Sequence, residues 1–199
     1  MMSKGQRLGW RILILLLLSV VFSAAWIVAR RRDRGRDIVD AGSVPALTVS
    51  SSSFADGGVI PAKFTCDGGD VSPELTVSAP PAGSRSLVLI VDDPDAPLGS
   101  FVHWVAFNLP TGLRVLHEGV AMHPEDFEGA VQGRNDFDKI GYGGPCPPRG
   151  KAHHYLFRVY ALDTSLQLPE GSTRREVAEA AKGHVLAEGK LVGLYKRGQ

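Results

Sequence analysis

The sequence predicts a mostly β fold with one helix near the C-terminus, preceded by a separate hydrophobic segment. Short apolar runs recur between turn residues, and the chain contains 23 Gly and 13 Pro, which favours many turns over a helical bundle. Strand patterns do not alternate with helical ones, so a parallel doubly wound sheet is not expected. With 199 residues, 44% of them hydrophobic, the chain can form one domain core plus an appendage.

Three segments have strong strand patterns. Residues 86–91 (SLVLIV) are almost entirely apolar, as in a strand that is buried on both faces. Residues 101–109 (FVHWVAFNL) and 154–162 (HYLFRVYAL) are the other two, and apolar side chains alternate onto one face of the last. Weaker strands are expected at 47–51, 59–65, 74–78 and 190–196.

The one predicted helix follows a recognisable start signal. Thr173 and Glu176 form the T-x-x-E pattern of a capping box. Apolar residues then recur every four positions as far as Val185. Because this pattern continues past Gly183, we expect Gly189 to end the helix. A packing role is expected for it.

The N-terminal segment differs from the rest of the chain. Residues 12–29 (ILILLLLSVVFSAAWIVA) contain no charge, and as a helix they would nearly match the ~30 Å hydrocarbon core of a bilayer. A cleaved signal peptide is the alternative, with Ser23 to Ala25 as the cleavage site. An anchor is favoured, because the apolar run continues to an arginine cluster. The sequence is therefore divided into a short flank (1–11), a transmembrane anchor or signal segment (12–29), a basic and polar linker (30–46) and one domain (47–199).

This division predicts a single-pass membrane protein, or a secreted or periplasmic one if the segment is cleaved. The arginines after residue 29 would keep the domain in the cytoplasm by the positive-inside rule. Two cysteines after an export-like segment favour an oxidising compartment instead, so the side of the membrane stays open. The net charge is +1 and no basic stripe is present in the domain, which argues against nucleic acid as a partner.

Polar residues gather after the first strong strand. The segment 92–97 (DDPDAP) places carboxylates at the end of a buried strand, where charge must be solvated, paired or used. An acidic turn is the alternative. In the next strand, alternation puts His103 on the same face as Val105 and Phe107. A lone His among apolar neighbours is usually a core residue, but a nearby carboxylate would orient the imidazole and favour its protonated form.

A glycine- and proline-rich segment precedes the third strong strand. Residues 141–150 read GYGGPCPPRG, and glycines of this kind allow backbone N–H groups to approach a ligand and form anion-binding nests. An ordinary surface loop is the alternative. His153, His154 and Tyr155 follow at the start of the strand. Together these segments place acids, imidazoles, a tyrosine and a glycine loop at strand ends.

These motifs resemble the phosphatidylethanolamine-binding protein family, in particular its bacterial and archaeal branch called Raf kinase inhibitor-like. The resemblance covers residue 47 to the end, and the stretches that carry it are IPAKFTCDGGDVSPEL, LVLIVDDPDAP, FVHWVAFNLP and GYGGPCPP…HHYLFRVYALD. It implies a large antiparallel sheet packed on a smaller one, with a C-terminal helix. It also implies a small pocket that accepts phosphate, phosphoethanolamine head groups, acetate or similar anions.

The resemblance assigns the pocket by motif position. The expected ligand-binding residues are Asp93, Asp95, Pro97, His103, Gly144, Cys146, Pro147, His153 and Tyr155. Cys66 and Cys146 both lie in family motifs, and a disulfide between them is expected, with two free thiols as the alternative. Three departures stand out. His154 replaces the usual Arg of H-R-Y, and Lys151 and Ala152 separate Gly150 from His153, so a local difference in loop length is expected. Val77 stands where many bacterial members have Trp, which is expected to alter packing near the pocket.

These features predict a membrane-tethered binding protein for phosphate or phospholipid head-group anions, with no cofactor, no metal and no catalytic residue. Imidazoles and backbone N–H groups would hold the anion, and the aspartates would orient the imidazoles. A ligand with an ammonium group near its phosphate would use both signs of charge. One alternative is an inhibitor of kinases or proteases, or another interaction module that modulates a protein partner. Another is a hydrolase that uses Cys146 with His153, or a metal at the Asp and His residues.

Overall fold

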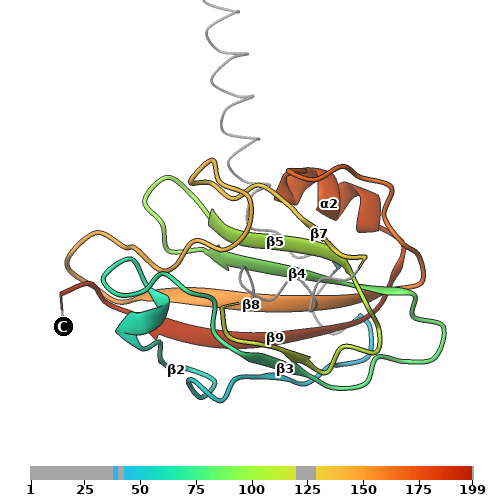
Figure 1. Ribbon diagram of the computed structural model, residues 1–199, viewed down its shortest axis with the longest axis horizontal. Coiled ribbons are helices and arrows are strands. Elements are labelled where there is room, and N and C mark those ends of the chain that lie inside the picture. Colours follow the sequence, from blue (N-terminus) through green and yellow to red (C-terminus); the bar gives the residue numbers. More distant parts are fainter. Residues whose placement is uncertain (1–37, 40–42, 120–128, 199) are drawn as a thin grey trace, which may run out of the picture.

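The computed structural model describes residues 38–39, 43–119 and 129–198, and it forms two sheets and one α-helix in these parts of the chain (Figure 1). The elements are β1 (Val49–Ser50), β2 (Gly58–Val59), the 3-10 helix η1 (Ala62–Phe64), β3 (Leu75–Val77), β4 (Ser86–Asp93), β5 (Phe101–Leu109), β6 (Val115–Leu116), β7 (Val131–Gln132), β8 (His153–Leu162), α2 (Arg174–Ala181) and β9 (Val185–Tyr195). The mostly β fold with two sheets and a C-terminal helix is confirmed.

The large sheet has the strand order β2-β9-β8-β4-β5-β7, and the small sheet has the order β1-β3-β6. All pairings are antiparallel except that of β2 with β9. The central strand β4 is buried along its whole length, as its apolar sequence predicts, because both faces of the large sheet are covered.

Two separate cores lie on the two faces of the large sheet. Along β4, Leu89 and Val91 belong to the core shared with the small sheet, whereas Val88 and Ile90 belong to the core shared with α2. Figure 1 shows α2 next to β5, with β3 on the opposite side of the large sheet. The alternation of β8 follows the prediction, because Phe157 and its same-face neighbours pack toward the small sheet.

The predicted helix is correct in its start and wrong in its end. Thr173 and Glu176 form the complete capping box. The helix ends at Ala181, and Gly183 follows it with a φ of +82°, a conformation that favours glycine. The apolar pattern beyond Gly183 belongs to β9, which begins at Val185 and therefore starts before the strand expected at 190–196.

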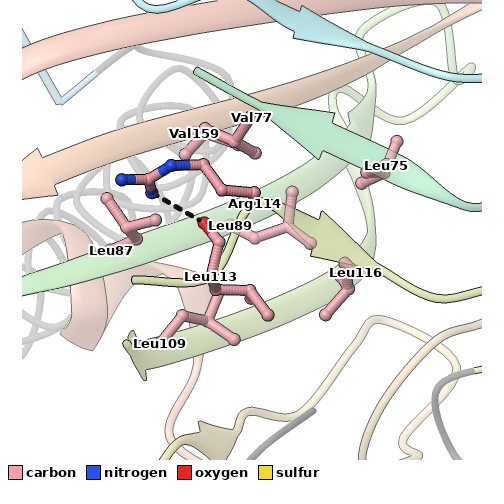
Figure 2. Close-up of a pocket in the computed structure, with 9 residues that line it drawn as sticks. All are labelled: Leu75, Val77, Leu87, Leu89, Leu109, Leu113, Arg114, Leu116 and Val159. Atoms are coloured by element: carbon pink, nitrogen blue, oxygen red, sulfur yellow. Dashed lines mark hydrogen bonds between the residues drawn. The ribbon is translucent and has the colours of Figure 1, made fainter. Parts of the chain in front are cut away.

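An apolar cavity of about 20 Å³ lies between the small sheet and the large sheet (Figure 2). Leu75 and Val77 line it from the small sheet, and Leu89 and Val159 line it from the large sheet. The Arg114 side chain lies beside the cavity and donates a hydrogen bond to the Leu113 carbonyl. Val77, for which altered packing near the anion pocket was expected, thus lies between the sheets.

The predicted membrane localisation is corrected. Within residues 38–39, 43–119 and 129–198, no helix is long and apolar enough to cross a membrane. The segment 12–29, on which the prediction depended, lies outside the described residues. We therefore leave membrane tethering out of the functional interpretation.

Candidate functional site

Antiparallel pairing brings the polar ends of β4, β5 and β8 together at one end of the large sheet. β4 ends at Asp93, which pairs with Phe101 at the start of β5. The same end of β4 lies beside the start of β8, where His153 and Tyr155 are found. Asp93, His103 and His153 are each 3% exposed and Tyr155 is fully buried, so these side chains form a cluster that is largely closed to water.

His153 is held by a carboxylate. Its Nδ1 lies 2.7 Å from Oδ2 of Asp93. The other carboxylate oxygen, Oδ1, accepts a hydrogen bond of 2.8 Å from the Asp95 backbone N–H. Because Nδ1–H donates to Asp93, the ring orientation is fixed and Nε2 is the nitrogen left for a ligand. This is the arrangement of acid and imidazole that the motifs predict.

His103 is held by the backbone instead. Its Nδ1 lies 2.7 Å from the Gly143 carbonyl oxygen, and the Gly143 N–H donates to the His103 carbonyl at 2.9 Å. Burial lowers the pKa of His103, so the neutral ring donates from Nδ1 and presents Nε2 as an acceptor. The expectation that a carboxylate orients this imidazole and favours its protonated form is therefore wrong.

A β-bulge turns His103 toward the site. β5 pairs Trp104 with Val91 but Val102 with Asp92, so the register shift leaves His103 as the extra residue. As a result, Val105 and Phe107 pack in the core beside α2, while the His103 ring contacts the Tyr155 ring on the other face, with 5.1 Å between centroids. Simple alternation, which put His103 on one face with Val105 and Phe107, fails at this bulge.

Tyr155 presents a buried hydroxyl group to the cluster. Its oxygen makes no well-formed hydrogen bond in the described part of the chain, and the Asp93 carboxylate is close enough to interact with it. Burial, and then the nearby Asp93 carboxylate, raise the pKa of Tyr155, so the phenol stays protonated and can donate. Buried polar groups are nearly always paired, and an unpaired one therefore calls for a functional explanation.

Asp95 stabilises the loop rather than the two imidazoles. Its Oδ2 accepts hydrogen bonds from the His154 backbone N–H at 3.0 Å and from Nδ1 of His154 at 2.7 Å. The His154 side chain is the main cause that lowers the pKa of Asp95. His154, which replaces the family Arg, thus still pairs with an acid at the strand end. Pro97 is exposed at the far side of this turn.

The glycine loop is fastened to the segment that follows η1. The Gly144 N–H donates to Oδ1 of Asp70 at 2.6 Å, and Cys146 forms a disulfide with Cys66. A Cβ at Gly144 would lie 2.5 Å from the Phe64 carbonyl oxygen, so only glycine allows this approach. The Gly144 amide therefore has a protein partner, while Pro147 is buried beside the disulfide.

Two phenylalanine rings contact the His103 ring. The centroids of Phe101 and Phe137 lie 5.2 Å and 5.4 Å from that of the imidazole, and 4.7 Å from each other. Phe137 is 38% exposed and forms part of the outer surface. Phe137 lies in a short turn with no periodic pattern, so no sequence signal indicates its place beside His103.

Other residues that support the site were also missed. Asp70 lies in the stretch IPAKFTCDGGDVSPEL, but no sequence signal links it to Gly144. Asp92 lies on the opposite face of β4, where it accepts hydrogen bonds from Ser100 and Arg158. These buried contacts of Asp92 hold the end of β4 and the start of the following turn in place.

The arrangement bears on the two hydrolase alternatives. The Cys146 sulfur is bonded to Cys66, so it offers no thiolate as a nucleophile. Within the described ranges, no three His, Cys, Asp or Glu side chains are grouped so that they could hold a metal ion. Neither alternative finds support in these parts of the chain.

Comparison with known proteins gives a consistent result. Residues 50–196 match the family model described as phosphatidylethanolamine-binding protein. A UPF0098 protein of Pyrococcus abyssi is 51% identical over 150 residues, which cover 74% of this chain and 84% of the relative. A UPF0098 protein of Methanothermobacter thermautotrophicus is 48% identical over 152 residues, which cover 76% of this chain and all of the relative.

Two crystal structures are similar to the described fold. A phosphatidylethanolamine-binding protein homologue from Chlamydia trachomatis has a TM-score of 0.70 and 40% identity, covering 76% of this chain and 98% of that one. YbcL of Escherichia coli, described as a member of the mammalian PEBP family, has a TM-score of 0.71 and 34% identity, covering 75% and 98%.

Proposed function

Since the chain belongs to the phosphatidylethanolamine-binding protein family, we propose that it is a non-catalytic binding protein that holds a small phosphate-type anion between His103, His153 and Tyr155. The observation that supports this most directly is the buried Tyr155 hydroxyl, which makes no well-formed hydrogen bond within the described residues. A phosphate oxygen placed there would accept the hydroxyl proton and remove the cost of an unpaired buried donor.

The two imidazoles suit a phosphate that keeps one proton. Both Nδ1 atoms donate to the protein, so Nε2 is the nitrogen left for a ligand, and the neutral His103 ring presents it as an acceptor. A P–O–H group can donate to such a nitrogen, while the other phosphate oxygens accept from Tyr155. The buried Asp93 carboxylate repels a fully ionised phosphate and adds to the preference for the protonated form.

Phosphoethanolamine is the proposed head group. Asp93 is buried in the cluster, and Asp95, two residues further along the chain, is only partly buried. An ammonium group two carbons away from the phosphate would lie in the field of these carboxylates. We therefore propose that phosphoethanolamine binds more tightly than inorganic phosphate.

The test is a calorimetric titration with phosphate and with phosphoethanolamine at pH 6. Tyr155→Phe removes the hydroxyl and keeps the ring, and it should weaken both ligands about tenfold or more, as expected for a hydrogen bond to a charged group. Tyr160→Phe is the matched control, because Tyr160 is equally buried but packs in the core beside α2. Equal affinities of the Tyr155→Phe and Tyr160→Phe proteins would refute the proposal.

An interaction module is the second candidate function. Leu98, Phe137 and Ile140 are large apolar side chains that stay 69%, 38% and 50% exposed. Leu98 lies in the turn after Asp95, and Phe137 contacts the site imidazole. A protein partner that covers Leu98 and Phe137 would bury apolar surface next to the anion site. Inhibition of a kinase or protease by this surface stays a prediction.

A further inference from the structure

The disulfide joins an exposed residue to a half-buried one. Cys66 lies in the exposed segment after η1, and Cys146 is half-buried between Pro145 and Pro147. Disulfide exchange starts when an external thiolate attacks one sulfur, so we expect the attack at the more exposed residue. Cys66 is therefore the expected point of entry.

The disulfide is one of several bonds between the same two segments. The Cys66 N–H donates to the Pro145 carbonyl at 3.1 Å, and the Tyr142 hydroxyl donates to the Phe64 carbonyl at 2.7 Å. The Gly144 N–H donates to the exposed Asp70 carboxylate. These three contacts are hydrogen bonds, which can be exchanged for bonds to water, whereas the disulfide joins the two segments covalently.

The segment that the disulfide holds also positions a site imidazole. Gly143 lies three residues before Cys146 and makes two backbone contacts with His103, through its carbonyl and its N–H. The Gly143 carbonyl determines which ring nitrogen carries the proton, because it accepts from Nδ1. A displacement of the segment would therefore change both the orientation of His103 and the nitrogen offered to a ligand.

We propose that Cys66–Cys146 is a thiol–disulfide exchange site for a dithiol reductant, and that its reduction frees residues 142–146 and displaces His103. The effect of reduction on ligand affinity rests on the proposed anion-binding function. The displacement of the loop and of the His103 imidazole is independent of that function.

The reaction balances with a dithiol as the reductant. A thiolate of the dithiol attacks the Cys66 sulfur, the bond between the two cysteines breaks, and Cys146 leaves as a thiolate that takes up a proton. The second thiolate of the dithiol then attacks the mixed disulfide and releases Cys66. The protein gains two electrons and two protons, and the dithiol becomes a disulfide.

The first measurement is the rate of reduction of the native protein by dithiothreitol, followed by alkylation of the thiols and mass analysis. We expect the rate to rise in proportion to the dithiothreitol concentration without any denaturant. Reduction that requires enough urea to unfold the protein would overturn the proposal, because the disulfide would then be closed to exchange in the folded state.

The second measurement follows the loop and the imidazole by NMR. Reduction should speed exchange of the Gly144 amide at least tenfold and shift the ¹⁵N resonance of His103 Nδ1, while amides of β4 stay protected. His184 is the control, because it pairs with Asp163 and lies outside this loop. Unchanged Gly144 exchange and an unchanged His103 resonance in the reduced, folded protein would overturn the proposal.

The third measurement links the disulfide to affinity. The reduced protein and the Cys66→Ser/Cys146→Ser variant should both bind phosphate at least fivefold more weakly than the oxidised protein, and dithiothreitol should not change the variant further. Equal affinity of the oxidised and reduced proteins would contradict the link. If the oxidised protein binds no phosphate at all, the proposed function fails, and the NMR measurement still decides the exchange-site proposal.

Discussion

His103 and His153 both bond to the protein through Nδ1, but their partners differ. His153 donates to the Asp93 carboxylate, and His103 donates to the Gly143 carbonyl. A carboxylate compensates an imidazolium charge, whereas a carbonyl in a buried site does so only weakly. The pKa of His103 is lowered by its burial, and two predictions follow from the pH dependence that this shift creates.

The first prediction concerns stability in acid. The folded-state pKa of His103 lies below its ordinary value of 6.5, so the unfolded chain binds the proton more readily. The stability contributed by neutral His103 is complete above pH 6.5 and is lost as the pH falls below that value. Urea unfolding at pH 7.5 and pH 5.0 should show a smaller acid loss in His103→Gln than in the wild type. An acid loss in His103→Gln equal to that of the wild type would contradict this assignment.

The second prediction concerns ligand affinity, which should increase in acid, whereas stability should decrease. Phosphate that is bound against the neutral His103 Nε2 must keep a proton, so affinity should rise as the pH falls from 8 to 6. Since a phosphomonoester has its second pKa near ~6, the rise should be several-fold. Titration calorimetry in two buffers of different ionisation enthalpy would report the proton taken up. Affinity that is independent of pH, with no proton exchange, would contradict the proposed protonation.

Residue identities in the site were predictable only where a motif marks them. Asp93 and His153 stand in signatures of the family, and a carboxylate next to an imidazole is chemistry that the sequence suggests. Gly143 supplies a backbone carbonyl to His103, and a carbonyl is present at every residue. No sequence signal therefore distinguishes the residue that holds His103, and the expectation of an acid at this position was wrong.

At the scale of elements, the bulge in β5 decides how the site is built. The register shift opposite Val91 and Asp92 leaves His103 unpaired in the ladder and turns it to the face of Tyr155. The alternation of β4 and β8 was predictable, since their apolar pattern is regular. The bulge was not, because it depends on the partner strand and on the connection that follows β4.

The third prediction tests the start of α2, which the sequence predicted correctly. Thr173 accepts a hydrogen bond from the Glu176 N–H, and Glu176 accepts one from the Thr173 N–H. Thr173→Ala should lower the free energy of unfolding by about 1 kcal/mol, as is typical for loss of an N-cap. Thr111→Ala, in a turn outside any helix, is the control for loss of a threonine. Equal losses in the two variants, measured by urea unfolding, would show that the capping box contributes nothing.

At the scale of the whole molecule, the large sheet separates two cores, and the site lies at one end of it. The presence of strands and their buried faces follows from the sequence pattern. The strand order does not, since alternation indicates which face is buried but not which strand lies next to which. The arrangement of two sheets was therefore expected from the family resemblance, and the structure adds the strand order and the cavity between the sheets.

The cavity leads to the last prediction. Val77 lines this space of about 20 Å³, whereas Val88 is fully buried in the other core. Val77→Ile adds one methylene beside a void and should raise the free energy of unfolding by up to about 0.8 kcal/mol. Val88→Ile adds the same methylene at a fully buried position in the core beside α2, and overpacking should lower the free energy of unfolding by about 1–3 kcal/mol. Urea unfolding of the two variants provides the comparison. If both substitutions destabilise the protein equally, the space beside Val77 cannot accept a methylene and the two cores are packed alike.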